Sequence, residues 1–467
     1  MMRRSLVVML GLVAACASTT SVIESTDAAD PSTTSRRDES TTTTEPPAAP
    51  PVTFPPAPTF PDGPLDPRTE EGVVGLLDSV FANDFDGAQL VKLLDGGDPR
   101  AAWLLADLLR FLQTGPPRDE LVYAFSQLTG APWIPGKVDF VWAFDNLIAW
   151  DLPAWDDYSN LKGSIYTRVS PSWQGFFDED VSVDWRLVTW GGVLADERPF
   201  GDNGPCNCIP ALDDPMTTDV VRGDWYDDDR IVFGLVVDGD ALALPKHQME
   251  VHEMLNLTLG GRQLGIPYCT LCGSAQAYFT DNVADIGRVV LRTSGLLSRS
   301  NKMMYDLTTG SLIDTFTGEA TSGPLAVADT VLEQTTVVAV TWGEWKKAHP
   351  ETQILAEDGG VGRQYRLDPL GSRDEDGPIF PVGDVDPRLG VHDNVVGVVT
   401  LDSVAIAFPV DAIVNASGAI EFEGVTVTVT DGIRVFAADG TEIPAHQSFW
   451  FAWSQFHPDT HLWVPES

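Results

Sequence analysis

Hydrophobic positions recur at helical spacing between residues 68 and 150. They fall three or four residues apart, which places the apolar side chains on one face of a helix. One such face is formed by Val73, Val74, Leu76, Leu77, Val80 and Phe81. Asp98 followed by Pro99 is typical of a helix start, because the carboxylate caps free amides and proline fits the first turn. These patterns predict a small helical domain over residues 68–150.

Strand patterns dominate from about residue 200 onward. Short runs rich in valine are separated by turns that contain glycine and aspartate. The clearest runs are 231–237, 289–291, 337–340, 395–399 and 425–429. We therefore expect an α+β protein, in which the N-terminal helical domain is followed by a large mainly-β domain with short helical inserts over residues 151–467. No internal repeat is recognisable along the sequence.

Aromatic residues are dense between residues 151 and 200. Such density is typical of core packing around irregular connections. An aromatic platform that binds carbohydrate is the alternative interpretation.

The N-terminus has the pattern of an exported bacterial lipoprotein. Two arginines precede a short apolar stretch from Leu6 to Val13, which is too short to span a bilayer. Cys16 ends this stretch after two alanines, and the segment resembles the lipobox, in which such a cysteine is lipidated. We expect residues 1–16 to be a lipoprotein signal peptide and Cys16 to be the lipid anchor.

Residues 17–67 are rich in threonine, serine and proline and poor in core-forming residues. Such a composition predicts a disordered tether. The membrane is thus the first expected partner, and the expected location is the cell envelope, on the extracytoplasmic side.

The charge balance excludes one class of partner. The chain has 29 Lys+Arg against 68 Asp+Glu, which gives a net charge of −39 at pH 7. A surface of that charge repels the phosphate backbone. We therefore exclude nucleic-acid binding.

Four cysteines remain after Cys16, in two close pairs. Thiolates two residues apart on a turn can share one metal ion, and imidazole or thioether can complete the shell. A soft site suited to copper would use Cys269, Cys272, His252 and Met304. A second arrangement adds the other pair, to give a four-thiolate site suited to zinc; that pair is Cys206 and Cys208.

The same cysteines are open to other interpretations. Outside the cytoplasm cysteines tend to oxidise, so one or two structural disulfides, including bridges between the two pairs, are an alternative. A Cys-x-x-Cys pair can also cycle as a dithiol, although the helix that usually follows such a motif is weakly indicated here. Glu253 is the candidate general base beside His252. Adjacent side chains diverge, so we expect at most one of these two to face the site.

Several short motifs follow one another in the order of a known bacterial family. They are Ile209-Pro210-Ala211-Leu212-Asp213-Asp214-Pro215, His252-Glu253, Cys269-Thr270-Leu271-Cys272, Ser294-Gly295-Leu296-Leu297, Met304-Tyr305-Asp306, Thr341-Trp342-Gly343-Glu344-Trp345 and His349-Pro350. From about residue 150 onward the chain resembles the family named domain of unknown function 3179. The resemblance implies no established activity. Leu242 stands where the family has arginine, and Leu257 where it has aspartate.

The leading hypothesis is a metal-binding or redox-related module centred on the Cys-x-x-Cys pair, with copper or zinc as the metal. The alternative is a cell-envelope binding or scaffold protein without catalytic activity, which has structural disulfides and contacts an envelope protein or a glycan.

Overall fold

The computed structural model describes residues 53–178, 182–283, 286–371 and 377–465. The predicted signal peptide, Cys16 and the tether up to residue 52 lie outside these residues. From residue 53 the chain is held against the helices that follow it. The indole N–H of Trp150 donates to the carbonyl of Pro55 (2.6 Å), and the guanidinium of Arg100 donates to the carbonyl of Gly63 (2.6 Å). The last part of the predicted tether is thus packed on the helical surface.

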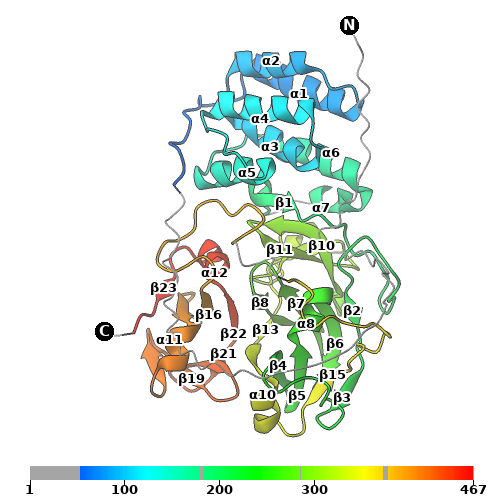
Figure 1. Cartoon of the computed structure of the whole chain (residues 1–467), viewed down its shortest axis with the longest axis vertical. Coiled ribbons are helices and arrows are strands. Elements are labelled where there is room, and N and C mark those ends of the chain that lie inside the picture. The colour runs from blue at the N-terminus through cyan, green and yellow to red at the C-terminus, as the bar shows by residue number, and fades with distance from the viewer. Residues whose placement is uncertain (1–52, 179–181, 284–285, 372–376, 466–467) are drawn as a thin grey trace, which may run out of the picture.

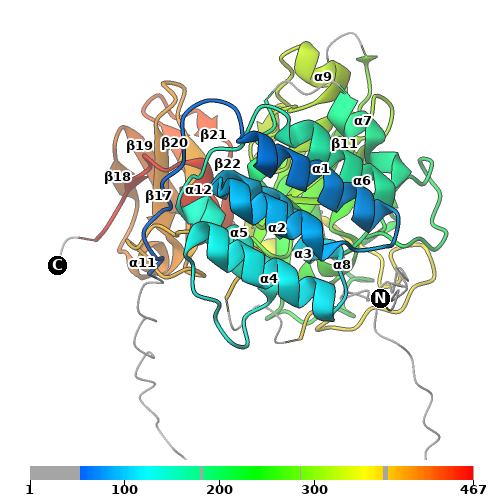
Figure 2. The same cartoon turned by 90° about the horizontal axis from the view of Figure 1, so that it is seen from above.

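The helices predicted over residues 68–150 form, and the helical region extends to residue 178 (Figure 1). Its α-helices are α1 (Pro67–Phe81), α2 (Gly87–Gly96), α3 (Ala102–Phe111), α4 (Pro116–Thr129), α5 (Asp139–Ala149), α6 (Tyr158–Val169) and α7 (Gln174–Asp178). Asp66 and Asp86 cap α1 and α2 by accepting amide hydrogen bonds. Seen from above, α1, α2 and α4 lie side by side (Figure 2). None of the helices in the described part of the chain is long and apolar enough to cross a membrane.

The core of the helical region continues into a sheet. That sheet has the order β1-β10-β11-β12, and its strands are β1 (Val188–Trp190), β10 (Leu291–Ser298), β11 (Asn301–Asp306) and β12 (Leu312–Asp314). Leu296, Met303 and Leu312 of these strands share one buried cluster with Trp103 and Trp142 of the helices. The predicted mixture of helix and strand is therefore confirmed, but the helices share their core with a sheet instead of enclosing a core of their own.

Residues 231–355, here called the first unit, contain two small sheets packed face to face. One sheet has the order β14-β4-β5-β15-β3, and the other has β13-β9-β7-β6-β2 with β8 beside β7. Phe233 and Leu244 of the one meet Leu255 and Ile266 of the other in a buried cluster, as in a β-sandwich. The elements are β2 (Leu212–Asp213) and β3 (Thr217–Asp219), which precede the unit, and β4 (Ile231–Val237), β5 (Asp240–Pro245), α8 (Lys246–His252), β6 (Met254–Leu259), β7 (Arg262–Cys269), β8 (Ser274–Ala275), β9 (Ala277–Phe279), α9 (Gly323–Val327), β13 (Gln334–Thr335), β14 (Val338–Thr341), α10 (Trp342–Ala348) and β15 (Gln353–Leu355).

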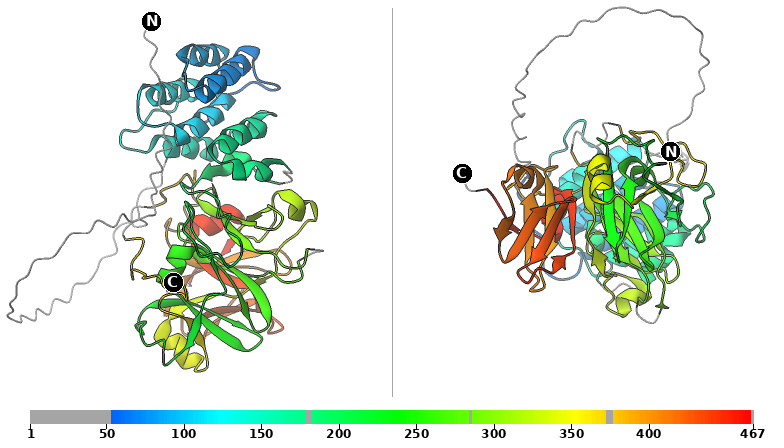
Figure 3. Two further views of the ribbon diagram at one scale, coloured as in Figure 1. Left: turned by 90° about the vertical axis from the view of Figure 1, so that its right-hand side faces the viewer. Right: turned by 90° about the horizontal axis from the view of Figure 1, so that it is seen from below.

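Residues 394–462, here called the second unit, repeat this arrangement beside the first (orange and red in Figure 3). Its sheets have the orders β22-β16-β17-β23 and β18-β19-β20-β21. The elements are β16 (Asn394–Val399), β17 (Ala405–Pro409), α11 (Val410–Asn415), β18 (Ile420–Phe422), β19 (Val425–Val429), β20 (Ile433–Ala437), β21 (Glu442–Ile443), β22 (Ala445–Phe449), α12 (Trp450–Phe456) and β23 (His461–Leu462). Even the parallel pairing of the last strand recurs, as β15 with β5 and as β23 with β17.

Equivalent side chains stabilise the interior of each unit. A Cβ atom on Gly234 would lie 2.5 Å from the ring of Trp345, and one on Gly397 would lie 2.0 Å from the ring of Trp453. In both units the indole therefore rests directly on the backbone of an inner strand, β4 in the first unit and β16 in the second.

The residues that follow each tryptophan also correspond. The indole N–H of Trp345 donates to Thr352 Oγ1 and that of Trp453 donates to Thr460 Oγ1, each over 2.9 Å. A histidine ring lies against each indole with centroids 4.2 Å apart; these are His349 and His457.

The expectation that the chain has no internal repeat is therefore wrong. The two units share few identical residues, chiefly a Trp-x-x-Trp-x-x-x-His-Pro pattern followed by threonine. The first unit is also interrupted between β9 and β13 by β10, β11, β12 and α9, which breaks any fixed period along the sequence.

Replacing the glycine under an indole tests this packing. We expect Gly397→Ala to lower the free energy of unfolding by about 1–3 kcal/mol, because the new methyl group overlaps the ring of Trp453. Gly175→Ala is the matched control, since nothing lies within 4 Å of its added Cβ atom. Denaturation by urea, followed by tryptophan fluorescence, measures both. An equal decrease in the free energy of unfolding in the two variants would contradict this role of the contact between Gly397 and Trp453.

Candidate functional site

The Cys269-Thr270-Leu271-Cys272 turn joins β7 to β8. Within the turn, the amide N–H of Cys272 donates to the carbonyl of Cys269 (3.2 Å). Gly273 then adopts a left-handed conformation (φ 62°), which glycine tolerates at little cost, and Ser274 pairs opposite Cys269. Cys269 and Cys272 form a disulfide with Cα atoms 5.3 Å apart. The turn thus holds a closed disulfide instead of two thiolate ligands.

This disulfide is buried where the first unit contacts the second, a contact surface here called the seam. Cys269 is 2% exposed and Cys272 is 0% exposed. Both belong to an apolar cluster with Trp450 and Phe451 of α12. The amide N–H of Phe449, at the end of β22, donates to the carbonyl of Cys272 (2.8 Å). The sulfur atoms are therefore covered by residues of the second unit.

Glu253 and Lys302 form a buried ion pair beside the turn. Lys302 Nζ lies 3.4 Å from Glu253 Oε2. It also donates to the carbonyl of Tyr268 (3.2 Å) and to the carbonyl of Glu253. The hydroxyl of Thr270, a residue of the turn itself, donates to Glu253 Oε1 (2.8 Å). Hydrogen bonds thus connect the buried ion pair to the backbone of Tyr268, just before the disulfide, and to the side chain of Thr270, within the turn.

Burial changes the acidity of this lysine. It lowers the pKa of Lys302 to about 8, against the opposing attraction of Glu253. An ordinary lysine, with a pKa of about 10.4, keeps its proton throughout the physiological range. Lys302, which is 5% exposed, is therefore a group that can take up or release a proton close to neutral pH.

His252 points away from the turn. Its Nδ1 lies 2.8 Å from the carbonyl oxygen of Pro210, and its Nε2 lies 2.7 Å from the hydroxyl of Tyr365. Burial lowers the pKa of His252 to about 4, although the carbonyl of Pro210 opposes this shift. The ring is thus neutral, with both nitrogens engaged. Glu253 alone of the two neighbours reaches the turn, as expected for adjacent residues.

Met304 is also separate from the cysteines. It lies on β11 in a different apolar cluster, which includes Met254 and Tyr278. Lys302 lies two residues earlier, on the same face of the strand, and reaches the turn in its place. The predicted copper site is therefore not assembled in this structure.

The second cysteine pair closes on itself near the surface. Cys206 and Cys208 form a disulfide with Cα atoms 5.1 Å apart. Neither the predicted four-thiolate zinc site nor a bridge between the two pairs is therefore assembled in this structure. Asp196, Cys206 and Cys208 are the one group of three potential ligands within 4.8 Å among the described residues. However, Asp196 is occupied by Arg198 (2.7 Å) and by the amide of Ala211 (2.8 Å).

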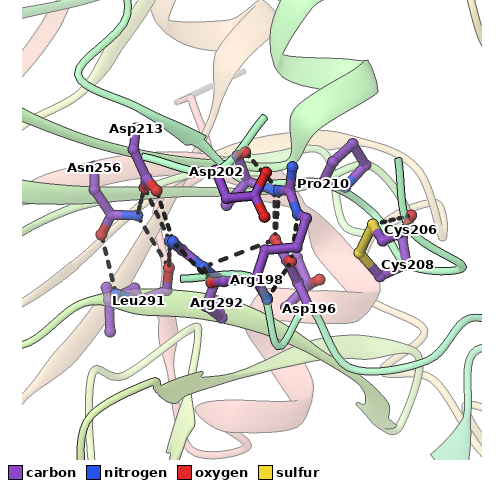
Figure 4. Close-up of polar contacts among 12 residues, drawn as sticks. Asp196, Arg198, Asp202, Cys206, Cys208, Pro210, Asp213, Asn256, Leu291 and Arg292 are labelled. Atoms are coloured by element: carbon purple, nitrogen blue, oxygen red, sulfur yellow. Dashed lines mark hydrogen bonds and ion pairs between the residues drawn. A yellow bond between two sulfur atoms is a disulfide. The ribbon is translucent and has the colours of Figure 1, made fainter. Parts of the chain in front are cut away.

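A network of buried charges lies next to this pair (Figure 4). Arg292, which is fully buried, donates to both carboxylate oxygens of Asp213 (2.9 and 2.6 Å). Asn256 donates to Asp213 (2.9 Å) and accepts from the amide of Leu291 (3.0 Å). Each group has a partner, so the network joins β2, β6 and β10.

Sequence reasoning missed Lys302 and Arg292. Each stands next to an apolar run, Arg292 after Val289-Val290-Leu291 and Lys302 before Met303-Met304-Tyr305. A charged residue within such a run is the signal that could have identified them, because charges are buried only with partners.

Most aromatic residues between 151 and 200 are packed in the helical core. An open groove of about 430 Å³ remains beside them, lined by Trp155, Tyr158, Trp185 and the Asp184–Arg186 pair, among others. The predicted carbohydrate platform stays a prediction, with this groove as its place.

The family described as "Protein of unknown function (DUF3179)" matches residues 206–441. The chain belongs to this family. The matched part includes the disulfide turn, the buried ion pair and most of the second unit, up to β20. No curated protein and no solved structure matches the chain.

Removing the charge of Arg292 tests whether the network of buried charges stabilises the fold. We expect Arg292→Leu to lower the free energy of unfolding by about 3–5 kcal/mol, because the carboxylate of Asp213 stays buried without its counter-charge. The double variant Arg292→Leu with Asp213→Leu should regain part of this loss. Urea denaturation measures both, and a double variant no more stable than the single one would contradict this account.

Proposed function

We propose that the protein is a lipid-anchored, extracytoplasmic module whose Cys269–Cys272 disulfide exchanges with dithiols. The observation that carries this proposal is the buried ion pair of Glu253 and Lys302, bonded to the same turn. A disulfide that serves only as a staple needs no proton carrier. A disulfide that cycles takes up two electrons and two protons when it is reduced and releases both when it is reoxidised.

The chemistry needs an external dithiol, such as a small dithiol or a dithiol protein of the envelope. One of its thiolates attacks one sulfur of the pair, and the other sulfur leaves as a thiolate. The second thiolate of the donor then breaks the mixed disulfide, so that the donor is oxidised and Cys269 and Cys272 are reduced. Lys302, still protonated below about pH 8, stabilises the thiolate that leaves and can supply its proton.

Lys302 should therefore raise the reduction potential of the pair. We expect Lys302→Met to lower the midpoint potential at pH 7 by about 30 mV or more, which corresponds to a tenfold change in the equilibrium constant. Lys302→Arg keeps the positive charge and should stay close to the parent value. Equilibration with dithiol buffers, followed by thiol trapping and mass spectrometry, measures each potential.

The Cys206–Cys208 disulfide is the internal control, because its potential should not change in either variant. An unchanged potential in Lys302→Met would contradict the role of the lysine. Reduction that coincides with loss of the fold would contradict redox exchange and favour the second candidate below.

The lipid anchor is a separate part of the proposal. We expect the full chain to partition into detergent and a Cys16→Ser variant to partition into water, because the variant lacks the acylated cysteine. Detergent phase separation of cells that express each form measures this. A Cys16→Ser protein that still enters the detergent phase would contradict lipidation at this position.

The second candidate is an envelope binding or scaffold protein with structural disulfides. The burial of Cys269 and Cys272 favours it, because buried cysteines in apolar surroundings are ordinarily inert. The groove beside Trp155 offers one partly exposed indole and a charged pair to a glycan. Binding of envelope glycans that is lost in Trp155→Ala, without any redox exchange, would support this candidate.

A further inference from the structure

The residues that cover the disulfide all approach it from outside its own sheet. Phe449 donates its amide to Cys272 (2.8 Å), and its ring lies 3.0 Å from where a Cβ atom on Gly273 would stand. Trp450, which is fully buried, is fixed by its indole N–H to the carbonyl of Asp386 (2.8 Å). Cys272 Sγ also lies 3.8 Å from the carbonyl oxygen of Ser300, in the turn between β10 and β11. On the side of the second unit, a thiol from solvent reaches the sulfur atoms once β22 and α12 move away from the turn.

Polar groups on both sides of the seam lack hydrogen-bond partners. On the first unit these are Ser274 and Gln276, whose neighbours Ala275 and Ala277 face the opposite side in the sandwich core. On the second unit the hydroxyl of Ser448 and Nε2 of His446 are unpartnered. His446 faces the first unit, since its ring lies 4.7 Å from that of Phe316.

Each of these side chains is at most 5% exposed. A buried polar group without a partner costs about 1–3 kcal/mol, a cost that hydration removes when the surfaces separate. These groups distinguish the seam from the two sandwich cores, which are apolar on both sides. Hydrogen bonds also cross the seam, such as the one from Gln334 Nε2 to His446 Nδ1 (3.1 Å).

The far end of the seam has a contact that opposes opening. His349, at the end of α10 in the first unit, donates from Nε2 to the carboxylate of Asp431 in the β19–β20 turn of the second unit (2.7 Å). Arg434 holds the same carboxylate with two further hydrogen bonds (2.7 and 2.8 Å). By the correspondence of the units, this turn occupies the place that the disulfide turn occupies in the first unit.

We propose that the second unit is a gate over the Cys269–Cys272 disulfide, opened by separation along the seam and held shut by the His349–Asp431 contact. The proposal rests on the redox function above and specifies its regulation: the dithiol reacts only with the open form. The rate of reduction is then limited by opening once the dithiol is abundant.

The test is the rate at which each disulfide of the full chain is reduced, as the concentration of dithiothreitol rises. Quenching with an alkylating reagent and peptide mass spectrometry separate the two pairs. We expect reduction of Cys206–Cys208, which lies near the surface, to rise in proportion to dithiothreitol. Reduction of Cys269–Cys272 should reach a plateau.

One substitution tests the contact that holds the gate. His349→Phe keeps an aromatic ring against Trp345 but cannot bond Asp431, and we expect it to raise the plateau rate roughly tenfold. Asp281→Asn is the matched control. It breaks the Arg262–Asp281 pair at the other end of β7 and should leave the plateau unchanged.

The possible outcomes distinguish a failure of the gate from a failure of the proposed redox function. Reduction of Cys269–Cys272 in proportion to dithiothreitol, at equal rates in parent and His349→Phe, would overturn the gate and leave the redox function standing. An equal acceleration by Asp281→Asn would also overturn the gate, because general destabilisation would then explain the effect. Reduction only at the rate of global unfolding, measured by circular dichroism, would overturn both.

Discussion

Each β unit depends on the contact between an indole and a glycine in one of its inner strands. The indole of Trp345 or Trp453 lies so close to the strand that no side chain fits beneath it. The same indole donates to a threonine just before the last strand of the unit, so one residue connects the helix, the sheet and that last strand. This device occurs twice, and the corresponding turn of each unit lies against a strand of the other unit: Gly273 faces Phe449, and Gly432 faces Val338.

The seam joins the units by different chemistry at its two ends. At one end the turn of the second unit carries Asp431, which bonds His349 and Arg434. At the other end the turn of the first unit carries the disulfide, covered by Trp450 and its neighbours. A charged hydrogen bond crosses the seam at one end, whereas at the other end apolar burial is joined by the hydrogen bond from the amide of Phe449 to the carbonyl of Cys272. This difference makes the disulfide inaccessible in the closed arrangement and leaves its protection dependent on contacts far from the sulfur atoms.

The insertion in the first unit supplies what the second unit lacks. Strand β11 brings Lys302 against Glu253 and the disulfide turn, while the next residue, Met303, packs into the helical core. The strand therefore connects the disulfide turn on one face with the helices on the other. The predicted soft metal site is not assembled in this arrangement, because Met304 and His252 lie near the cysteines in sequence but have other partners in space.

The sequence by itself determined the helices up to residue 150, the strands that follow, the disulfide turn as the point of interest, and the divergence of His252 from Glu253. These follow from local periodicity and residue chemistry. Only the tertiary structure decided that each cysteine pair closes on itself, that Lys302 completes the site, and that the chain contains two copies of one unit. Each of these depends on residues far apart in sequence, such as Glu253 and Lys302 or Gly397 and Trp453. Local patterns carry no information about which distant strands become neighbours, because that choice is made by the packing of whole sheets.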